Sequence, residues 1–363
     1  MGESTQGMVQ ATGQAIGQTS ALTSGSTSKL ANRQVDILFT LAQDVAGAGE
    51  VETLTLSGYR VRCQIASTGL ESGMTCSVRV EGLSPPLLNR LSLMQEGMVA
   101  QTRNTVTIMA GDGAGQGNSA MPVVFSGGVV EAFVDYANSP DVAFELRAFS
   151  GALPAAVPVA PTSFGGDVAV ATLMQVLATK AGLAFANYGV QTMLRGGVYY
   201  KGSVAEQVDS CARAARISYQ IGVGVLAIWP AGMVAPAQGQ AHTVSVAPGL
   251  VGYPSYSQYG VLFQTVFNPD ILFRDTVCLQ TGAPTPQGAG QASAAQTGTT
   301  GVSGQTGSTS AGATQAGDVP LPTRGMWVVQ SVRHDLQTEQ PDGPWFTTVE
   351  AARPDFAGQA YAG

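Results

Sequence analysis

Charged residues are scarce in this 363-residue chain. Asp, Glu, Lys and Arg make up 11% of it, against about 25% in an ordinary soluble domain. Only three of the 17 basic residues are lysines. A freely diffusing monomer normally keeps a more charged surface for solubility, whereas the cores of protein interfaces are depleted in charge. The scarcity favours a permanent assembly in which other protein covers much of the surface; the alternative is a general compositional bias toward small residues.

The chain also lacks a positive charge balance and long apolar runs. Its net charge of −7 argues against a protein that binds nucleic acid through the phosphates. It is compatible with a surface that lets nucleic acid pass without binding it. No run reaches the roughly 18 apolar residues of a membrane span. Residues 1–30 contain no apolar core of a signal peptide. We therefore expect assembly in a reducing cytoplasm, without stable membrane insertion.

Cysteine and histidine are too few, and wrongly spaced, for a zinc site. The four cysteines are Cys63, Cys76, Cys211 and Cys278. They show no CxxC spacing, and His242 and His334 are the only histidines. Strand-like alternation around Cys63 and Cys76 predicts that these two thiols lie opposite each other on an inward sheet face. They could form a disulfide, but two reduced core thiols that act as small apolar groups are favoured.

Motifs of catalysis are missing too. The sequence contains no convincing nucleophile elbow, zincin helix, P-loop or lysozyme-like carboxylate pair. His334-Asp335 is the only adjacent pair with catalytic character, and at the end of a predicted strand it is more typical of a polar strand terminus. Asp135, Asp141 and Glu145 are scattered over predicted strands and indicate a solvated or interface face. We therefore assign no catalytic, cofactor-binding or metal-binding residue and no cofactor, and we predict that the protein is not an enzyme.

One glycine cluster, residues 111–117 (GDGAGQG), invites comparison with phosphate-binding loops. Such a loop stands between a strand and a helix, and a P-loop also needs a Lys followed by Ser or Thr. Here the following segment, Pro122–Phe125, has the character of a strand. The cluster therefore predicts a hairpin loop.

What is present is mostly β pattern. Residues 1–31 are rich in Gly, Ser, Thr and Gln, and we expect a flexible N-terminal tail. Residues 32–152 form a first β domain in this interpretation. Its strands are predicted at 35–41, 51–56, 59–67, 74–81, 105–110, 123–135 and 142–149, with a short helix at 85–94.

A different pattern occupies the middle of the chain. Residues 153–163 contain several prolines and predict an extended linker. Residues 164–232 predict an α/β module: a helix at 168–181, short strands, a second helix and a β-hairpin. Ser203 and Glu206 have the spacing of a capping box for that second helix, which is followed by strands around Gly222-Val223-Gly224.

β character then returns. Residues 233–280 and 318–356 predict a second β domain, with strands at 249–256, 261–267, 271–280, 325–336 and 345–352. Residues 281–317 interrupt it with almost nothing but Gly, Ala, Ser, Thr, Gln and Pro, and we expect a disordered insertion. The fold class is mainly β with an α/β module: two related barrel-like β domains bracket a helix-strand-helix-hairpin domain.

Three passages make the chain resemble the central hub proteins of contractile phage-tail baseplates, a group related to the hub part of type VI secretion spikes. These passages are the strand Phe125–Ala132 with Leu146–Gly151, the module Phe164–Pro230, and the pair His334–Leu336 with Gly343–Thr348. The N-terminal tail and residues 281–317 depart from the family pattern.

The resemblance implies a structural protein of the virion tail. Hubs of this family form homotrimers, and two similar β domains per chain give a pseudo-six-fold ring between a six-fold tail tube and a three-fold spike. The partners implied are tail-tube or tube-initiator proteins above, a trimeric spike below, baseplate wedge proteins around, and DNA only in transit. It also implies that residues 33–150 and 240–356 share one strand order. A tail-associated cell-wall hydrolase and a carbohydrate-binding adhesin remain the alternatives.

Overall fold

The structure is a computed structural model that describes twelve stretches of the chain. These are residues 33–42, 51–68, 73–92, 104–112, 121–137, 139, 142–156, 158–230, 242–245, 249–257, 260–280 and 324–353. All of them belong to one compact unit, Asn32–Gly363. The predicted N-terminal tail, residues 1–31, and the predicted insertion, residues 281–317, lie outside the described residues.

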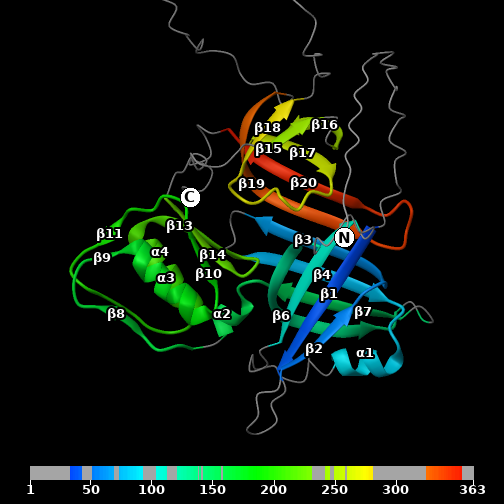
Figure 1. Cartoon of the computed structure of the whole chain (residues 1–363), viewed down its shortest axis with the longest axis horizontal. Helices are drawn as coiled ribbons and strands as arrows, with labels where there is room; N and C mark the ends of the chain where they lie inside the picture. Colours follow the sequence, from blue (N-terminus) through cyan, green and yellow to red (C-terminus); the bar gives the residue numbers. More distant parts are fainter. Residues whose placement is uncertain are drawn as a thin grey trace, which may run out of the picture. The chain divides into compact units, whose positions relative to one another are not determined.

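Strands from both ends of the chain join one 13-stranded sheet (Figure 1). Seven of them form what we call the first strand group: β1 (Arg33–Ala42), β2 (Val51–Leu56), β3 (Arg60–Thr68), β4 (Met74–Glu81), β5 (Thr105–Asp112), β6 (Val123–Asp135) and β7 (Ala143–Phe149). Helix α1 (Pro85–Ser92) follows β4, as predicted, and buries Leu88 and Leu91. Strict alternation in β3 and β4 places one apolar face in the first core.

The remaining six strands form the second strand group: β15 (His242–Ser245), β16 (Leu250–Tyr256), β17 (Gly260–Val266), β18 (Thr276–Gln280), β19 (Arg324–Gln337) and β20 (Trp345–Ala352). Their inward side chains, among them Phe263, Trp327 and Val349, make a separate core. The mainly β fold with an α/β module is thus confirmed.

The two groups share one strand order. Neighbours run β3-β4-β7-β6-β5-β1 in the first group and β16-β17-β20-β19-β18-β15 in the second. Numbered along the chain, six strands of each group therefore lie in the order 2-3-6-5-4-1, and β2 is an addition that pairs with β1. The last pair differs in direction, because β1 and β5 are antiparallel whereas β15 and β18 are parallel.

β3 and β19 join the two groups. They pair antiparallel from Ser331 opposite Thr68 to Gln337 opposite Arg62, and Figure 1 shows them side by side. Leu336 and Trp345, both from the second group, are buried in the first core. The joint is therefore continuous backbone pairing with shared apolar packing.

The α/β module has its own core. Its elements are β8 (Thr162–Phe164), β9 (Val168–Ala169), α3 (Val170–Ala181), β10 (Ala184–Asn187), β11 (Met193–Leu194), β12 (Val198–Tyr200), α4 (Val204–Ala215), β13 (Ile217–Gly222) and β14 (Val225–Pro230). The predicted capping box begins α4: the Glu206 amide donates to Ser203 Oγ at 3.3 Å, and the Ser203 amide donates to Glu206 Oε2 at 2.9 Å. The stripe of Val208, Cys211, Ala212 and Ala215 is buried.

Two predicted segments are wrong in detail. The extended linker was predicted from residue 153, but Ala152–Ala156 form a short helix, α2. A Cβ placed on Gly128 would lie 2.9 Å from Ala152 Cβ, so the bare glycine of β6 lets this turn pack closely on the sheet. Pro154 is tolerated because the first helical turn lacks partners for its amides.

The strand predicted at 271–280 begins only at Thr276. Residues 271–275 make a turn instead, in which Asp275 Oδ2 accepts a hydrogen bond of 2.7 Å from the Leu272 amide. Arg274 has a positive φ of 71° inside it. A carboxylate that caps a local amide competes with strand pairing, which explains the shortened strand.

Candidate functional site

The α/β module meets the strand groups through its terminal hairpin, β13–β14. Gly73, just before β4, forms an isolated parallel bridge with Ile221 of β13. The Ser150 hydroxyl accepts a hydrogen bond of 2.7 Å from the Met74 amide and donates one of 2.5 Å to the Ile221 carbonyl. One residue earlier, Gln220 Nε2 donates to Ser67 Oγ at 2.6 Å. These contacts are buried, so they fix the module against the first strand group.

The hairpin tip is shaped for the same contact. Gly222 pairs with Val225, and the two residues between them, Val223 and Gly224, have φ values of 48° and 74°. Two positive φ values are the signature of a type I′ hairpin turn. A β-branched residue is rarely found there, because its side chain clashes with the backbone. Val223 packs against the first core, and this apolar contact offsets the backbone strain.

A cavity of about 180 Å³ lies where the hairpin and both strand groups meet. Aromatic side chains define one wall: the Tyr188 and Trp229 rings stack with centroids 5.1 Å apart, and Phe273 meets Trp229 edge-on at 5.7 Å. Val332 and His334 of β19 line it from the second strand group. Its lining is mostly apolar, and the hydroxyl of its serine, Ser67, is hydrogen-bonded to Gln220, so the cavity has the character of a packing joint.

His334 is a buried core residue of that joint. Its Nδ1 lies 2.9 Å from Thr347 Oγ1, which also accepts a hydrogen bond of 2.9 Å from the Asn268 amide. Burial lowers the pKa of His334 to about 4, although Asp335 opposes the shift. Its ring is therefore neutral at physiological pH.

The pair His334-Asp335 does not work as a unit. Successive strand residues point to opposite faces, and Asp335 forms an ion pair of 3.1 Å with Arg333 on the other face. The prediction of a polar strand terminus was wrong, because His334 lies inside β19 and is only 5% exposed.

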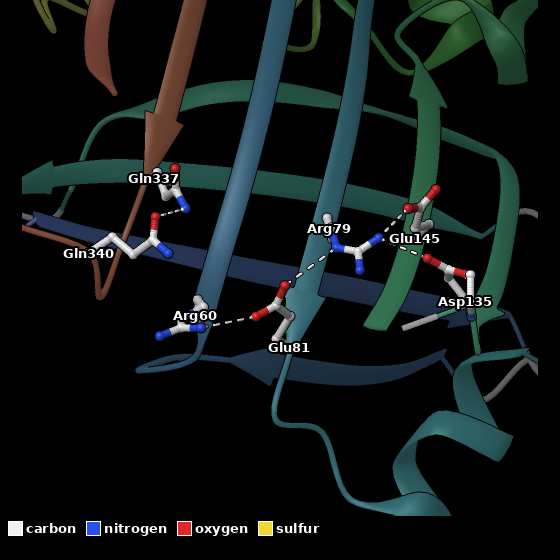
Figure 2. A network of polar contacts seen from close by, with 8 residues as sticks. Arg60, Arg79, Glu81, Asp135, Glu145, Gln337 and Gln340 are labelled. Atoms are coloured by element: carbon white, nitrogen blue, oxygen red, sulfur yellow. Dashed lines mark hydrogen bonds and ion pairs between the residues drawn. The ribbon is translucent and has the colours of Figure 1, made fainter. Parts of the chain in front are cut away.

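The carboxylates predicted to be scattered meet around one guanidinium. Arg79 Nη1 lies 2.9 Å from Asp135 and 2.7 Å from Glu145, and its Nε lies 3.4 Å from Glu81 (Figure 2). Glu81 in turn pairs with Arg60 at 3.3 Å. The sequence interpretation missed this cluster because β4, β6 and β7 bring its members together from distant positions.

This cluster, Arg79 with Glu81, Asp135 and Glu145, does not suit glycoside hydrolysis. The Ala137 amide and the Arg79 guanidinium lower the pKa of Asp135. A general acid in a glycosidase needs a carboxyl whose pKa is raised. The geometry is that of a partly exposed ion-pair cluster on the sheet. Asp141, the third carboxylate singled out, lies outside the described residues.

The cysteines occupy packed positions. The Sγ atoms of Cys63 and Cys76 lie 4.0 Å apart and both residues are buried. The prediction that they lie directly opposite each other was wrong, because Cys76 faces Ile65 and Cys63 faces Val78. Burial, with Cys63 beside it, raises the pKa of Cys76, and burial raises the pKa of Cys211 to about 12. Both shifts favour the unreactive thiol.

Other parts of the chain offer little chemistry. Within the described stretches, no three His, Cys, Asp or Glu side chains gather where they could hold a metal ion. Of the helices that the structure describes, none has the length and apolar character needed to cross a bilayer. The glycine cluster starts at the end of β5, which pairs antiparallel with β6. Residues 113–120 between them, and the His242 side chain, lie outside what is described.

The sequence interpretation also missed a set of exposed apolar side chains on two strands. Val130 lies within β6 and Tyr136 directly follows it, whereas Tyr253 and Tyr256 lie on β16; all are at least 58% exposed. The signal was available in principle, since Val129 and Val130 are consecutive apolar residues where strict alternation would place one of them outside.

Comparison with known proteins gives matches in sequence and in fold. The family model "Baseplate hub gp41" matches residues 37–282. The 43 kDa tail protein of prophage MuSo2 from Shewanella oneidensis shares 8% identity over 88% of this chain and 98% of that chain, with a TM-score of 0.51. The tail protein from Neisseria meningitidis MC58 shares 9% over 90% and 99%, with a TM-score of 0.50.

A type VI secretion component of E. coli, the c3393 protein, shares 10% identity over 86% of this chain and 76% of that chain, with a TM-score of 0.45. No curated protein matches the sequence. The two tail proteins with TM-scores of 0.51 and 0.50 show a common fold, and the family model carries the family assignment.

Proposed function

Because the chain belongs to the baseplate hub gp41 family, we propose that three copies of it form a ring at the centre of a phage-tail baseplate. The ring adapts a six-fold tail tube to a three-fold spike and lets DNA pass during ejection. The protein is a structural component of the virion tail, and the trimer, the adaptor role and the DNA passage are our proposals.

One observation carries the proposal: the two strand groups of a single chain have the same strand order. Three such chains present six similar β units. A three-fold assembly can match a six-fold neighbour only if each chain supplies two equivalent faces. The observed order supports that equivalence, although the sequences of the two groups differ. Domain boundaries at 32–152 and at 233–280 with 318–356 remain predictions.

Partners follow from the position in the ring. We propose tail-tube or tube-initiator proteins on the six-fold side, a trimeric spike on the three-fold side and wedge proteins outside, with assembly in the host cytoplasm. DNA is a passing partner. The net charge of −7 suits this role, because an acidic wall repels phosphates and does not hold the genome back.

A role without catalysis fits the candidate sites described above. His334 is buried and neutral, Asp335 faces away from it, and the carboxylates near Arg79 are paired with that guanidinium. A cell-wall hydrolase would need an accessible carboxylate of raised pKa, and Asp135 shows the opposite shift.

The mass of the purified chain in solution tests the trimer. Sedimentation equilibrium should give about three times the 37.1 kDa of one chain at micromolar concentration. A chain that stays at 37.1 kDa up to high concentration contradicts the ring, and a stable dimer contradicts the matching of six-fold and three-fold partners.

A further inference from the structure

The joint between the two strand groups depends on one long strand. β19 pairs with β20 along one edge, from Val328 to Leu336. Along its other edge it pairs first with β18, up to Val328, and then with β3, from Ser331 onward. The second half of β19 therefore serves as the docking edge for β3, which belongs to the other group.

β6 has the same construction in the first strand group. It pairs with β7 from Gly128 to Asp135, and on its other edge it pairs with β5 only up to Gly128. Among the described residues, no strand pairs with that other edge from Glu131 to Asp135. β6 thus has an open edge that corresponds to the edge of β19 with which β3 pairs.

The correspondence extends to single residues. The pairing of β6 with β7 shifts register between Val129 and Glu131, and that of β19 with β20 shifts between Val329 and Ser331. The Val129 amide donates to the Asn104 carbonyl at 3.1 Å, and the Val329 amide donates to the Asp275 carbonyl at 2.8 Å. Each acceptor precedes the neighbouring strand, β5 or β18. A shared bulge and a shared hydrogen bond make Val129 the counterpart of Val329.

The counterpart of β3 is β16. β3 lies beside β4, and β16 lies beside β17, at one end of the strand order. β3 also pairs with β19 on its other edge, whereas β16 has, in the part of the chain that the structure describes, a strand neighbour on one edge only, β17. An edge strand of this kind is a template for pairing with another chain.

Side chains at the edge of β19 that is joined to β3, the joined edge, are less exposed than their counterparts at the matching edge of β6, the open edge. A missing neighbour at the open edge accounts for this difference. At the joined edge, Gln330 is 1% exposed and Leu336 is fully buried. Their counterparts at the open edge, Val130 and Tyr136, are 65% and 63% exposed. On β16, Tyr253 is 86% exposed. Large apolar side chains are thus exposed on both strands, where a neighbour would cover them.

We propose that β16 of one copy pairs antiparallel with the Glu131–Asp135 end of β6 in the next copy. This contact repeats between chains the pairing of β3 with β19 inside a chain, and it rests on the proposed trimer. Because it joins two different surfaces, it propagates head to tail and closes after three copies, giving six alike joints around the ring.

The register can be derived from the pairings. One set of facing residues runs Gln64, Ser77, Arg147, Glu131 across β3, β4, β7 and β6. The matching set runs Ser255, Leu262, Glu350, Ser331 across β16, β17, β20 and β19. Ser255 is therefore the counterpart of Gln64. Since Asp335 faces Gln64 inside the chain, Asp135 should face Ser255 of the neighbouring copy.

Thiol crosslinking tests this register. Cβ atoms of facing residues in an antiparallel pair lie about 4.5–5.5 Å apart, within reach of a short thiol-specific crosslinker. A chain with both Asp135→Cys and Ser255→Cys should give covalent dimers and trimers. Two single variants, co-assembled, should give covalent dimer that neither gives alone. The wild-type chain, whose Cys63, Cys76 and Cys211 are buried, measures the background.

A second pair of cysteine variants tests the alternative in which the ring closes by pairing β16 with β2, the strand at the other end of the strand order. Thr53→Cys on β2 combined with Ser255→Cys should give no covalent dimer above background. Crosslinking of that pair, or a trimer of correct mass without the Asp135–Ser255 crosslink, overturns this inference and leaves the proposed ring standing. A wild-type chain that is monomeric overturns both.

A second set of variants covers the case in which the thiol at Asp135 disturbs the Arg79 cluster. Val130→Asp and Tyr136→Asp change exposed side chains, so the folded chain should persist while trimer is lost at concentrations where the wild type is trimeric. Tyr199→Asp in β12, at a site of 65% exposure like that of Val130, is the control and should stay trimeric. Trimers that tolerate both Val130→Asp and Tyr136→Asp contradict the proposed contact.

Discussion

The Ser150 hydroxyl connects two parts of the chain by donating a hydrogen bond of 2.5 Å to the Ile221 carbonyl. It also accepts the Met74 amide at 2.7 Å, so one buried side chain satisfies a backbone acceptor of the α/β module and a backbone donor of the first strand group. Removing it would leave both groups buried without this partner.

Ser150→Ala should lower the free energy of unfolding by about 1–3 kcal/mol, the usual cost of an unsatisfied buried polar group. Urea unfolding followed by circular dichroism measures it. Ser163→Ala, at an exposed position of β8, is the matched control and should change stability by no more than about 0.5 kcal/mol. Equal stabilities for the two variants would show that Ser150 does not hold the module.

Stability should depend on pH through His334. Burial lowers the pKa of this residue from 6.5 to about 4, so between these values the unfolded chain binds a proton that the folded chain excludes. The free energy of unfolding should therefore fall as pH drops from about 6.5 to about 4, by on the order of 3 kcal/mol from this residue.

His334→Gln isolates that contribution, because other acidic groups titrate equally in both proteins. The difference in unfolding free energy between wild type and variant should shrink as pH falls through this window. A difference that is constant from pH 7 to pH 4 would mean that His334 is not buried in solution.

The Arg79 cluster should contribute little to the free energy of unfolding at high salt. Arg79→Met removes the guanidinium shared by Glu81, Asp135 and Glu145 and leaves three carboxylates that repel one another. We expect a loss of roughly 1 kcal/mol at low ionic strength, because the site is partly exposed, and a smaller loss in 1 M salt. Salt-independent destabilisation would point to lost packing of the arginine stem instead.

The purified chain should not clear host peptidoglycan in a zymogram. Asp135 and Glu145 are held near Arg79, and the lowered pKa of Asp135 disfavours the protonated form that a general acid needs. Assembled tails could still clear it through a separate lytic subunit. Clearing by the isolated chain that Glu145→Gln abolishes would make this protein an enzyme as well as a ring.

Local patterns in the sequence predicted local structure well. Ser203 and Glu206 predicted the start of α4 because a capping box involves residues three apart, and the stripe ending at Ala215 predicted its buried face. Alternating residues predicted most strands. The short helix α2 was missed because its stability comes from packing on Gly128, which is distant in sequence.

Contacts across the sheet could not be read in the same way. Cys63 and Cys76 were placed two residues out of register, because alternation gives the face of a strand and leaves its offset to the turn. The gathering of Asp135 and Glu145 around Arg79 depends on the strand order, and no residue pattern encodes it. The pairing of β3 with β19 joins residues that are far apart in the sequence, so no local pattern predicts it either.

End-on electron-microscopic averages of the purified assembly test the central claim most directly. Three chains with two alike strand groups each should give a ring of six similar lobes at low resolution, which resolves into three-fold symmetry as detail increases. A ring with another number of lobes, or three lobes with a visible gap between chains, would contradict the equivalence of the two groups on which the account depends.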